Sequence, residues 1–225
     1  MGRLERRLVL LALLLPCACS AVGPVSPAPP REMVVLVHGM GRSSLSMRSL
    51  ARALKQAGFA TSSFDYSSTR HGVDELCVQL ASHVAELERD EGARVHFVGH
   101  SLGNLLIRGA LGSTPPAHVG RIVMLAPPNR GAAAADAYAP WFGWLLEPLD
   151  ELGPAGAAAR LPVPPLEIGV IAGALDGKVQ VEETHLAGEK DHVTVPGLHS
   201  FLMNRADVQE LTLRFLREGR FAPES

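Results

Sequence analysis

The middle of the sequence carries residues 95–104, which read Val-His-Phe-Val-Gly-His-Ser-Leu-Gly-Asn. The run Val95–Val98 is apolar and β-branched, as expected of a strand buried on both faces of a sheet. A G-x-S-x-G motif with its serine at position 101 follows at once and opens a helical pattern over 102–111. This succession predicts a strained strand-to-helix turn that raises Ser101 above the sheet. Side chains in place of the two glycines would clash with neighbouring backbone.

Short apolar runs and helical patterns alternate on both sides of this turn. We expect strands near residues 33–37, 59–64, 95–98, 121–125, 167–172 and 192–195. Apolar residues at helical spacing predict helices near residues 43–54, 73–87, 102–111 and 208–215. Strands that alternate with helices predict a parallel sheet covered by helices on both sides.

Length and composition are those of one globular domain. The chain has 225 residues, of which 47% are apolar and 20% charged, with a net charge of −2. No cluster of Lys and Arg occurs beyond the N-terminus, so we expect no nucleic acid partner. No His, Asp and Glu occur at a metal-ligand spacing such as H-E-x-x-H, so we expect no metal site.

The N-terminus has the pattern of a secretory signal over residues 1–21. Arginines precede the apolar run Leu8–Leu15, and small residues follow it. Residues 22–31 read as a Pro-rich linker, and 32–225 as the folded domain. We therefore expect an exported protein, periplasmic or secreted. It is either free or held at a membrane through a lipid on Cys19, although the residues before Cys19 match a lipoprotein signal imperfectly. A start codon placed too far upstream is the alternative.

A serine hydroxyl at such a turn points to nucleophilic chemistry. The hydroxyl needs a base to remove its proton, and an imidazole base needs a carboxylate to hold its tautomer. In a sheet of this kind the partners follow in the order Ser, Asp, His, each after a strand. Asp176 follows the predicted strand 167–172, and His199 follows the last strand. We therefore predict a triad of Ser101, Asp176 and His199.

Other residues compete for the last two roles. His192 and Asp191 lie at the start of the last predicted strand, which is the wrong end of the sheet, and His185 precedes that strand. The alternative for Asp176 and His199 themselves is that each is a polar residue of a surface loop.

Acyl transfer also needs two N–H donors directed at the oxygen that becomes negative. One donor is expected from Leu102, directly after the serine and at a helix N-terminus. The second is expected from the loop after the first strand, where residues 38–41 read His-Gly-Met-Gly. The alternative for this loop is a glycine-rich turn that only reverses the chain. His38 itself is expected to be structural.

Taken together, three motifs resemble the small bacterial α/β-hydrolase lipases and esterases. They are the loop 38–41, the motif 99–104 and the late pair Asp176-Gly177 and His199-Ser200-Phe201. The likeness runs from about residue 33 to 221, and residues 124–131 resemble a loop of lipase-like members. It implies Met40 as the second N–H donor, carboxylic ester hydrolysis through an acyl-enzyme, and no cofactor. It also implies a minimal α/β-hydrolase fold of about six mostly parallel strands flanked by helices, without the first two strands of larger members.

Residues 127–165 form the segment that the motifs constrain least. Trp141, Trp144 and Leu145 lie on one predicted helical face, which predicts a lid or a wall of an acyl pocket. The alternative is a helix that packs this face on the sheet.

Three functions remain open at this point. The first is hydrolysis of a small-molecule or lipid ester. The second is an acyltransferase that uses the same triad and passes the acyl group to an alcohol or a lipid. The third is a binding protein without catalysis, because a fold does not fix a function.

Overall fold

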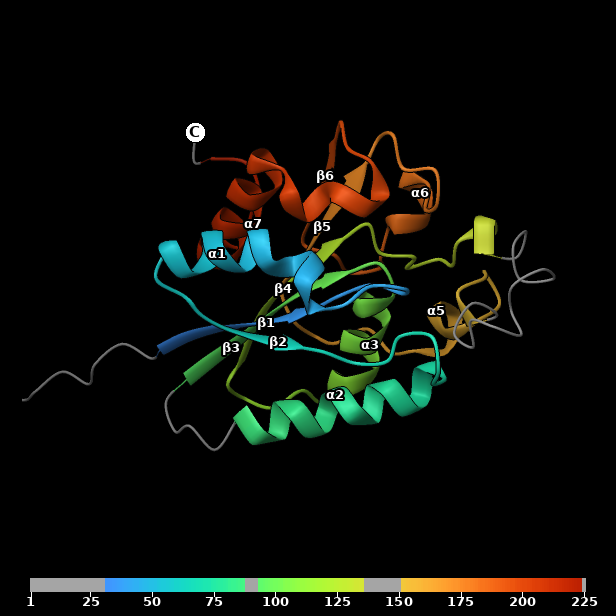
Figure 1. Ribbon diagram of the computed structural model, residues 1–225, viewed down its shortest axis with the longest axis horizontal. Coiled ribbons are helices and arrows are strands. Elements are labelled where there is room, and N and C mark those ends of the chain that lie inside the picture. Colours follow the sequence, from blue (N-terminus) through green and yellow to red (C-terminus); the bar gives the residue numbers. More distant parts are fainter. Residues whose placement is uncertain (1–30, 88–92, 136–150, 224–225) are drawn as a thin grey trace, which may run out of the picture.

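The centre of the protein is a six-stranded sheet, seen in the computed structural model of Figure 1. The structure describes residues 31–87, 93–135 and 151–223. The strands are β1 (Arg31–Val37), β2 (Ala60–Phe64), β3 (Ala93–His100), β4 (Val119–Leu125), β5 (Ile168–Gly173) and β6 (Asp191–Val195). Every neighbouring pair is parallel. The prediction of six mostly parallel strands is confirmed.

The strand order β2-β1-β3-β4-β5-β6 reverses direction once. The chain moves from β1 outward to β2, and then returns to place β3 on the other side of β1. Loops that follow the strands on the two sides of such a switch point diverge, which opens a crevice at the carboxyl ends of the strands. The loops after β1 and β3 flank this crevice, and they carry the His-Gly-Met-Gly stretch and Ser101.

Helices cover both faces of the sheet (Figure 1). The first face carries α2 (Val73–Leu87) and α3 (Leu102–Leu111), which pack in one apolar cluster with short α5 (Ala157–Arg160). The second face carries α1 (Arg48–Gln56) and α7 (Ala206–Glu218), which share the other apolar cluster with the 3₁₀ turn η1 (Ser44–Met47). Short α6 (Val181–Thr184) precedes β6, and the 3₁₀ turn η3 (His199–Asn204) follows it.

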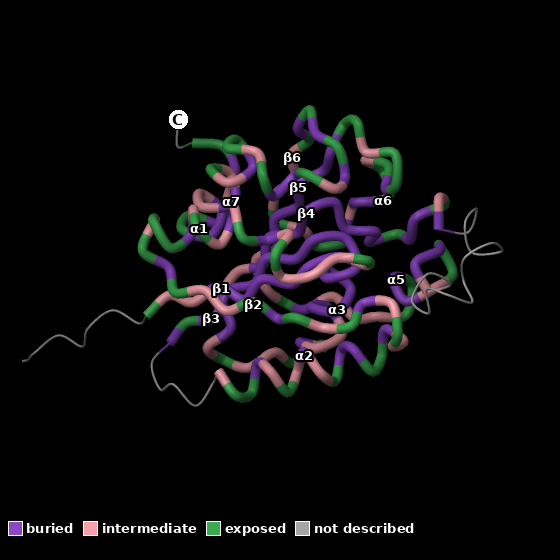
Figure 2. Tube along the Cα trace, in the orientation of Figure 1, coloured by how far each residue is buried: buried purple, intermediate pink, exposed green. Residues whose placement is uncertain are grey.

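The central strands of the sheet are buried on both faces, as their apolar runs predict (Figure 2), whereas the edge strands β2 and β6 are partly exposed. Every residue of β5 is buried, and the last six residues of β3 are buried as well. Gly169 on β5 allows α7 to approach closely, because an added Cβ would lie 2.6 Å from the ring of Phe215. Burial of apolar surface stabilises the fold by about 25 cal/mol per Å², so the two apolar layers on the sheet are its main source of hydrophobic stabilisation.

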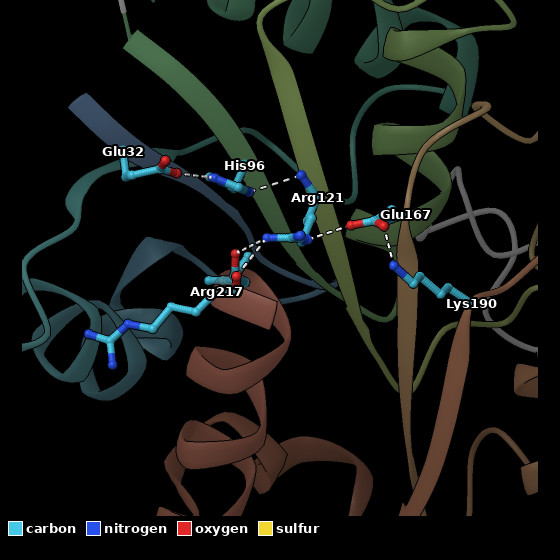
Figure 3. Close-up of polar contacts among 7 residues, drawn as sticks. Glu32, His96, Arg121, Glu167, Lys190 and Arg217 are labelled. Carbon is cyan, nitrogen blue, oxygen red and sulfur yellow. Dashed lines mark hydrogen bonds and ion pairs between the residues drawn. The ribbon is translucent and has the colours of Figure 1, made fainter. Parts of the chain in front are cut away.

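A row of polar side chains links the amino ends of five strands (Figure 3). We call it the charge row, and it consists of Glu32, His96, Arg121, Glu167 and Lys190. His96, which is buried, bonds to Glu32 through Nε2 and accepts the Arg121 N–H at Nδ1 over 2.9 Å. The Arg121 side chain bonds to Glu167 at 2.5 Å, and Glu167 also bonds to Lys190.

Arg121 extends the charge row to α7. Its Nη1 donates to the carbonyl oxygens of Leu216 and Arg217 at 2.9 and 3.0 Å, which satisfies carbonyls at the end of that helix. The row therefore joins the strands to one covering helix, at the end of the sheet opposite the loops that follow the strands.

The predicted elements occur within a few residues of their expected bounds. The predicted signal over 1–21 lies outside the described residues, as does nearly all of the linker 22–31. Within the described ranges, no helix is both long and apolar enough to cross a membrane.

Candidate active site

Ser101 occupies a strained turn between β3 and α3. Its φ is +52°, in a region that residues other than glycine rarely adopt. The Ser101 N–H donates to the carbonyl of Leu125 on β4 at 3.0 Å. The buried Asn104 side chain donates from Nδ2 to the carbonyls of Ser101 and Leu125, both at 3.1 Å. These bonds hold the turn in its strained conformation at the top of the sheet.

The two glycines of the motif make room for this turn. A Cβ on Gly103 would lie 2.4 Å from the carbonyl oxygen of Val37, at the end of β1. A Cβ on Gly99 would lie 2.3 Å from Oδ1 of Asn104 and 2.8 Å from the Ile107 side chain. The expected clash with backbone therefore occurs at Gly103, whereas Gly99 is constrained by side chains of α3.

Asp176 and His199 meet although 23 residues separate them in the sequence. Asp176 lies in the loop after β5 and His199 begins η3 after β6, so both come from the carboxyl ends of adjacent strands. His199 Nδ1 lies 2.6 Å from Asp176 Oδ2. Asp176 Oδ1 accepts the N–H groups of Lys178 and Val179 at 2.8 and 2.9 Å. The carboxylate is thus fixed at both oxygens, and Nε2 of His199 is left for other chemistry.

The surroundings of Asp176 keep it ionised. Burial opposes the charge, and the Asp176 side chain is 0% exposed. The hydrogen bond from His199 and the two backbone N–H donors outweigh this cost, so the pKa of Asp176 lies below its usual range. A charged carboxylate at this place orients the imidazole and stabilises its protonated form.

Ser101 and His199 border one pocket of about 450 Å³. The loop after β1 supplies Met40 and Gly41 to the same pocket, and the loop after β4 supplies Pro128 and Ala132. Within the part of the chain that the structure describes, most of the other lining side chains are small or apolar. The serine and the histidine therefore face a space of the size that binds a small organic ligand.

The loop after β1 lies close against Ser101. A Cβ on Gly39 would lie 3.2 Å from Cβ of Ser101 and 2.8 Å from Nδ1 of His100. The Gly41 N–H is engaged, since it donates to Ser68 Oγ at 3.0 Å. Met40, between these glycines, lines the pocket, and Leu102 begins α3 directly after the serine. The two residues expected to supply N–H donors therefore flank Ser101.

The histidines next to these motifs have packing roles. His38 is fully buried and stacks on Tyr66 with ring centroids 4.2 Å apart, which fits the structural role expected of it. His100, which the sequence did not single out, is buried and its Nε2 lies 2.9 Å from the carbonyl oxygen of His199. Burial, above all, lowers the pKa of His100 to about 3. It is therefore a neutral ring whose Nε2–H donates to the backbone of His199.

The competing residues lie elsewhere. His185 and His192 stack on each other with ring centroids 4.0 Å apart, and neither lines the pocket around Ser101. His185 Nδ1 lies 2.6 Å from Glu189 Oε1, and His192 Nε2 lies 2.9 Å from Thr184 Oγ1. The side chains of His185, Glu189 and His192 thus form a cluster, which the sequence spacing did not predict. Asp191 accepts the Phe221 N–H at 2.6 Å and so fixes the end of the chain after α7.

The segment 127–165 contributes a wall to the pocket through its described parts. Pro128, Ala132 and Leu152 line the pocket, and the last two also belong to the apolar cluster under α2 and α3. The predicted acyl-pocket residues Trp141, Trp144 and Leu145 lie outside the described residues.

The sheet order, the strained serine after β3 and the loops after β5 and β6 together define a known architecture. The chain has the α/β-hydrolase fold. Residues 28–128 match the family described as "Putative serine esterase (DUF676)", which covers less than half of the chain. No curated protein sequence matches the chain.

Solved structures with this fold differ widely in activity. The mature lipase BlEst2 of Bacillus licheniformis superposes with a TM-score of 0.65 at 20% identity, over 79% of this chain and 88% of that one. A "putative thioesterase" from Silicibacter sp. gives 0.61 at 16% identity, over 81% and 73%. A bromoperoxidase from Bacillus anthracis gives 0.62 at 15%, over 84% and 93%. Likeness at these identities establishes the α/β-hydrolase fold, and the chemistry has to be argued from the site.

Proposed function

We propose that this protein is a serine hydrolase that cleaves carboxylic esters through an acyl-enzyme. The observation that carries the proposal is the bond between His199 and the buried carboxylate of Asp176, beside the pocket that Ser101 borders. The match of residues 28–128 to a serine esterase family and the lipase among the solved structures support a hydrolase.

In the first half of the reaction, Ser101 Oγ attacks the carbonyl carbon of the ester, and its proton passes to His199 Nε2. The carbonyl oxygen becomes an oxyanion, which the N–H groups of Met40 and Leu102 stabilise. The tetrahedral intermediate then collapses. The bond to the alcohol oxygen breaks, His199 returns the proton to that oxygen, and the acyl group stays on Ser101.

In the second half, water attacks the acyl-enzyme and gives its proton to His199. The second tetrahedral intermediate releases the acid, and His199 returns the proton to Ser101 Oγ. Asp176 stays ionised throughout, because its pKa is held below the usual range, and it stabilises the imidazolium that forms in each half.

The experiment that tests the proposal combines a fluorophosphonate probe with p-nitrophenyl esters of rising chain length. Ser101→Ala and His199→Ala are expected to lose turnover by several powers of ten. Ser82→Ala, on the exposed side of α2, is the control for loss of a hydroxyl and is expected to match the wild type. Folded wild-type protein that neither reacts with the probe nor cleaves any ester in the series would contradict the proposal.

A further inference from the structure

Two cationic side chains line the pocket beside Ser101. Arg42 follows Gly41 in the loop after β1, and Lys178 lies two residues after Asp176 in the loop after β5. Apart from His199 and His100, the other described residues of the lining are uncharged: Met40, Gly41, Ser101, Pro128, Ala132, Ala134, Ala135, Leu152, Val179 and Ser200. Among these described residues, the formal charge of the pocket lining is therefore positive.

The Arg42 guanidinium is partly buried beside the pocket. Its Nε is buried and has no hydrogen-bond partner in the described part of the chain. Asp65, the acidic residue that contacts this loop, accepts the Ser44 N–H at 3.1 Å and lies 3.4 Å from Nε2 of His38. A buried donor without an acceptor costs free energy, so this guanidinium is suited to an acceptor brought by a ligand.

Lys178 is held in place by its backbone, and its side chain has no ion-pair partner among the described residues. Its N–H donates to Asp176 Oδ1 at 2.8 Å, which ties the residue to the loop of the candidate triad. The residue is exposed, and no described acidic side chain pairs with its ammonium group. A cation that lines the pocket in this way is available to a substrate.

We propose that the preferred substrate is an ester that carries a second, anionic group, a carboxylate or a phosphate, which Arg42 and Lys178 bind. This inference rests on the proposed function and names the substrate class of the same site. The apolar wall made by Ala132, Leu152 and Val179 takes the hydrocarbon part of the substrate. A guanidinium offers paired donors that match carboxylate and phosphate oxygens, and an ammonium adds a point charge.

The test compares esters that differ only in the anion. The first pair is the mono-p-nitrophenyl ester of glutaric acid against p-nitrophenyl pentanoate, which places a carboxylate at the end of the acyl part. The second pair is 1-hexanoylglycerol 3-phosphate against 1-hexanoylglycerol, which places a phosphate on the alcohol part. The pair in which the anionic ester is cleaved faster shows whether the bound anion is a carboxylate on the acyl part or a phosphate on the alcohol part.

Variants assign the preference to residues. Arg42→Gln and Lys178→Gln are each expected to lower the ratio of kcat/KM for the anionic ester to kcat/KM for the neutral ester about tenfold, equivalent to about 1.4 kcal/mol. Arg52→Gln and Lys55→Gln remove the same kinds of charge from exposed positions of α1. They are expected to leave kcat/KM for both esters unchanged. Added salt is expected to reduce the preference of the wild type.

Two results would overturn the inference. In the first, the wild type cleaves the neutral member of each pair at least as fast as the anionic member. In the second, Arg42→Gln and Lys178→Gln lower kcat/KM for the anionic and the neutral ester by the same factor. Hydrolysis of neutral esters that depends on Ser101 would leave the proposed function intact in either case. Calorimetric binding of 1-hexanoylglycerol 3-phosphate and of glutarate to the Ser101→Ala protein gives a readout without turnover. Binding that weakens about tenfold in Ser101→Ala/Lys178→Gln supports the inference, and absence of binding for both probes contradicts it.

Discussion

His100 Nε2 and the carbonyl oxygen of His199 are 2.9 Å apart, so the residue before the candidate nucleophile holds the backbone of the candidate base. The two rings also lie against each other, with centroids 4.9 Å apart. His100 lacks a described partner at Nδ1 and is fully buried, which means that its bond to His199 is the polar contact that fixes it. Through this bond the turn at Ser101 and the loop at His199 are set relative to each other.

The first prediction concerns this contact. His100→Phe keeps an aromatic ring in the space but removes the donor, which leaves the His199 carbonyl without its bond. We expect kcat for a neutral p-nitrophenyl ester to fall about tenfold, because a lost bond of about 1–3 kcal/mol misplaces the base. KM is expected to change little. An unchanged kcat in stably folded His100→Phe would show that His199 keeps its position without this bond.

The second prediction concerns the carboxylate. Asp176→Asn preserves the shape of the side chain but loses the charge that holds the His199 tautomer, so we expect kcat to fall by about four powers of ten, as for other triads. Unfolding in urea is expected to show that the variant is folded. Asp191→Asn, at the amino end of β6, is the matched control and is expected to retain full turnover. Equal losses in both variants would argue that Asp176 is not the acid of the triad.

The third prediction concerns the packing of α3 on β1. Gly103→Ala places a Cβ 2.4 Å from the Val37 carbonyl oxygen, and backbone on both sides must move. We expect a loss of about 2–3 kcal/mol in the free energy of unfolding, measured by urea denaturation. Gly177→Ala is the control, because an added Cβ there meets no atom of the described residues within 4 Å. A Gly103→Ala protein as stable as this control would show that the contact with Val37 is not tight.

The fourth prediction concerns pH and the charge row. Hydrogen bonds from Lys190 and Arg121 lower the pKa of Glu167 in the folded state, although burial opposes this. The stabilisation is therefore fully present above the unfolded pKa, about 4.3, and is lost as the pH falls through the lower folded value. Glu167→Gln is expected to destabilise the protein at pH 7 by less than about 1 kcal/mol, since the side chain is 40% exposed.

The Glu167→Gln variant also tests the direction in which stability changes with pH. The difference between wild type and Glu167→Gln is expected to shrink as the pH is lowered toward 3, because wild-type Glu167 is then protonated as well. Glu86→Gln, on an exposed position of α2, is the control for the loss of a carboxylate outside the charge row. A difference that grows as the pH falls would contradict the assignment.

Much of this architecture could be predicted from local sequence patterns. The central strands β3, β4 and β5 carry apolar runs, and the helices repeat apolar residues every three or four positions, so both patterns are present in short windows. The order of Ser101, Asp176 and His199 along the chain, each after a strand, predicted residues that the fold brings to one pocket or into direct contact.

What could not be predicted depends on contacts between distant positions. His100 and His199 are 99 residues apart, and no periodicity links a ring nitrogen to one particular carbonyl. Arg108 is a further case. Its guanidinium is buried and donates to the carbonyls of Ala158 and Leu161, which a helical pattern with one basic residue does not reveal. Arg42 and Lys178 lie in loops that the sequence did identify, but only the folded loops bring them to one pocket.

The charge row has a consequence for how this protein can change. It joins five strands at one end of the sheet, while the candidate active site is built from loops at the other end. Features that maintain the scaffold are therefore spatially separated from those that meet substrate. A library that randomises the loop positions 42 and 178 alters the surface offered to a ligand without touching the row. Directed evolution of specificity in this protein can thus begin from those loops with the rest of the sheet held constant.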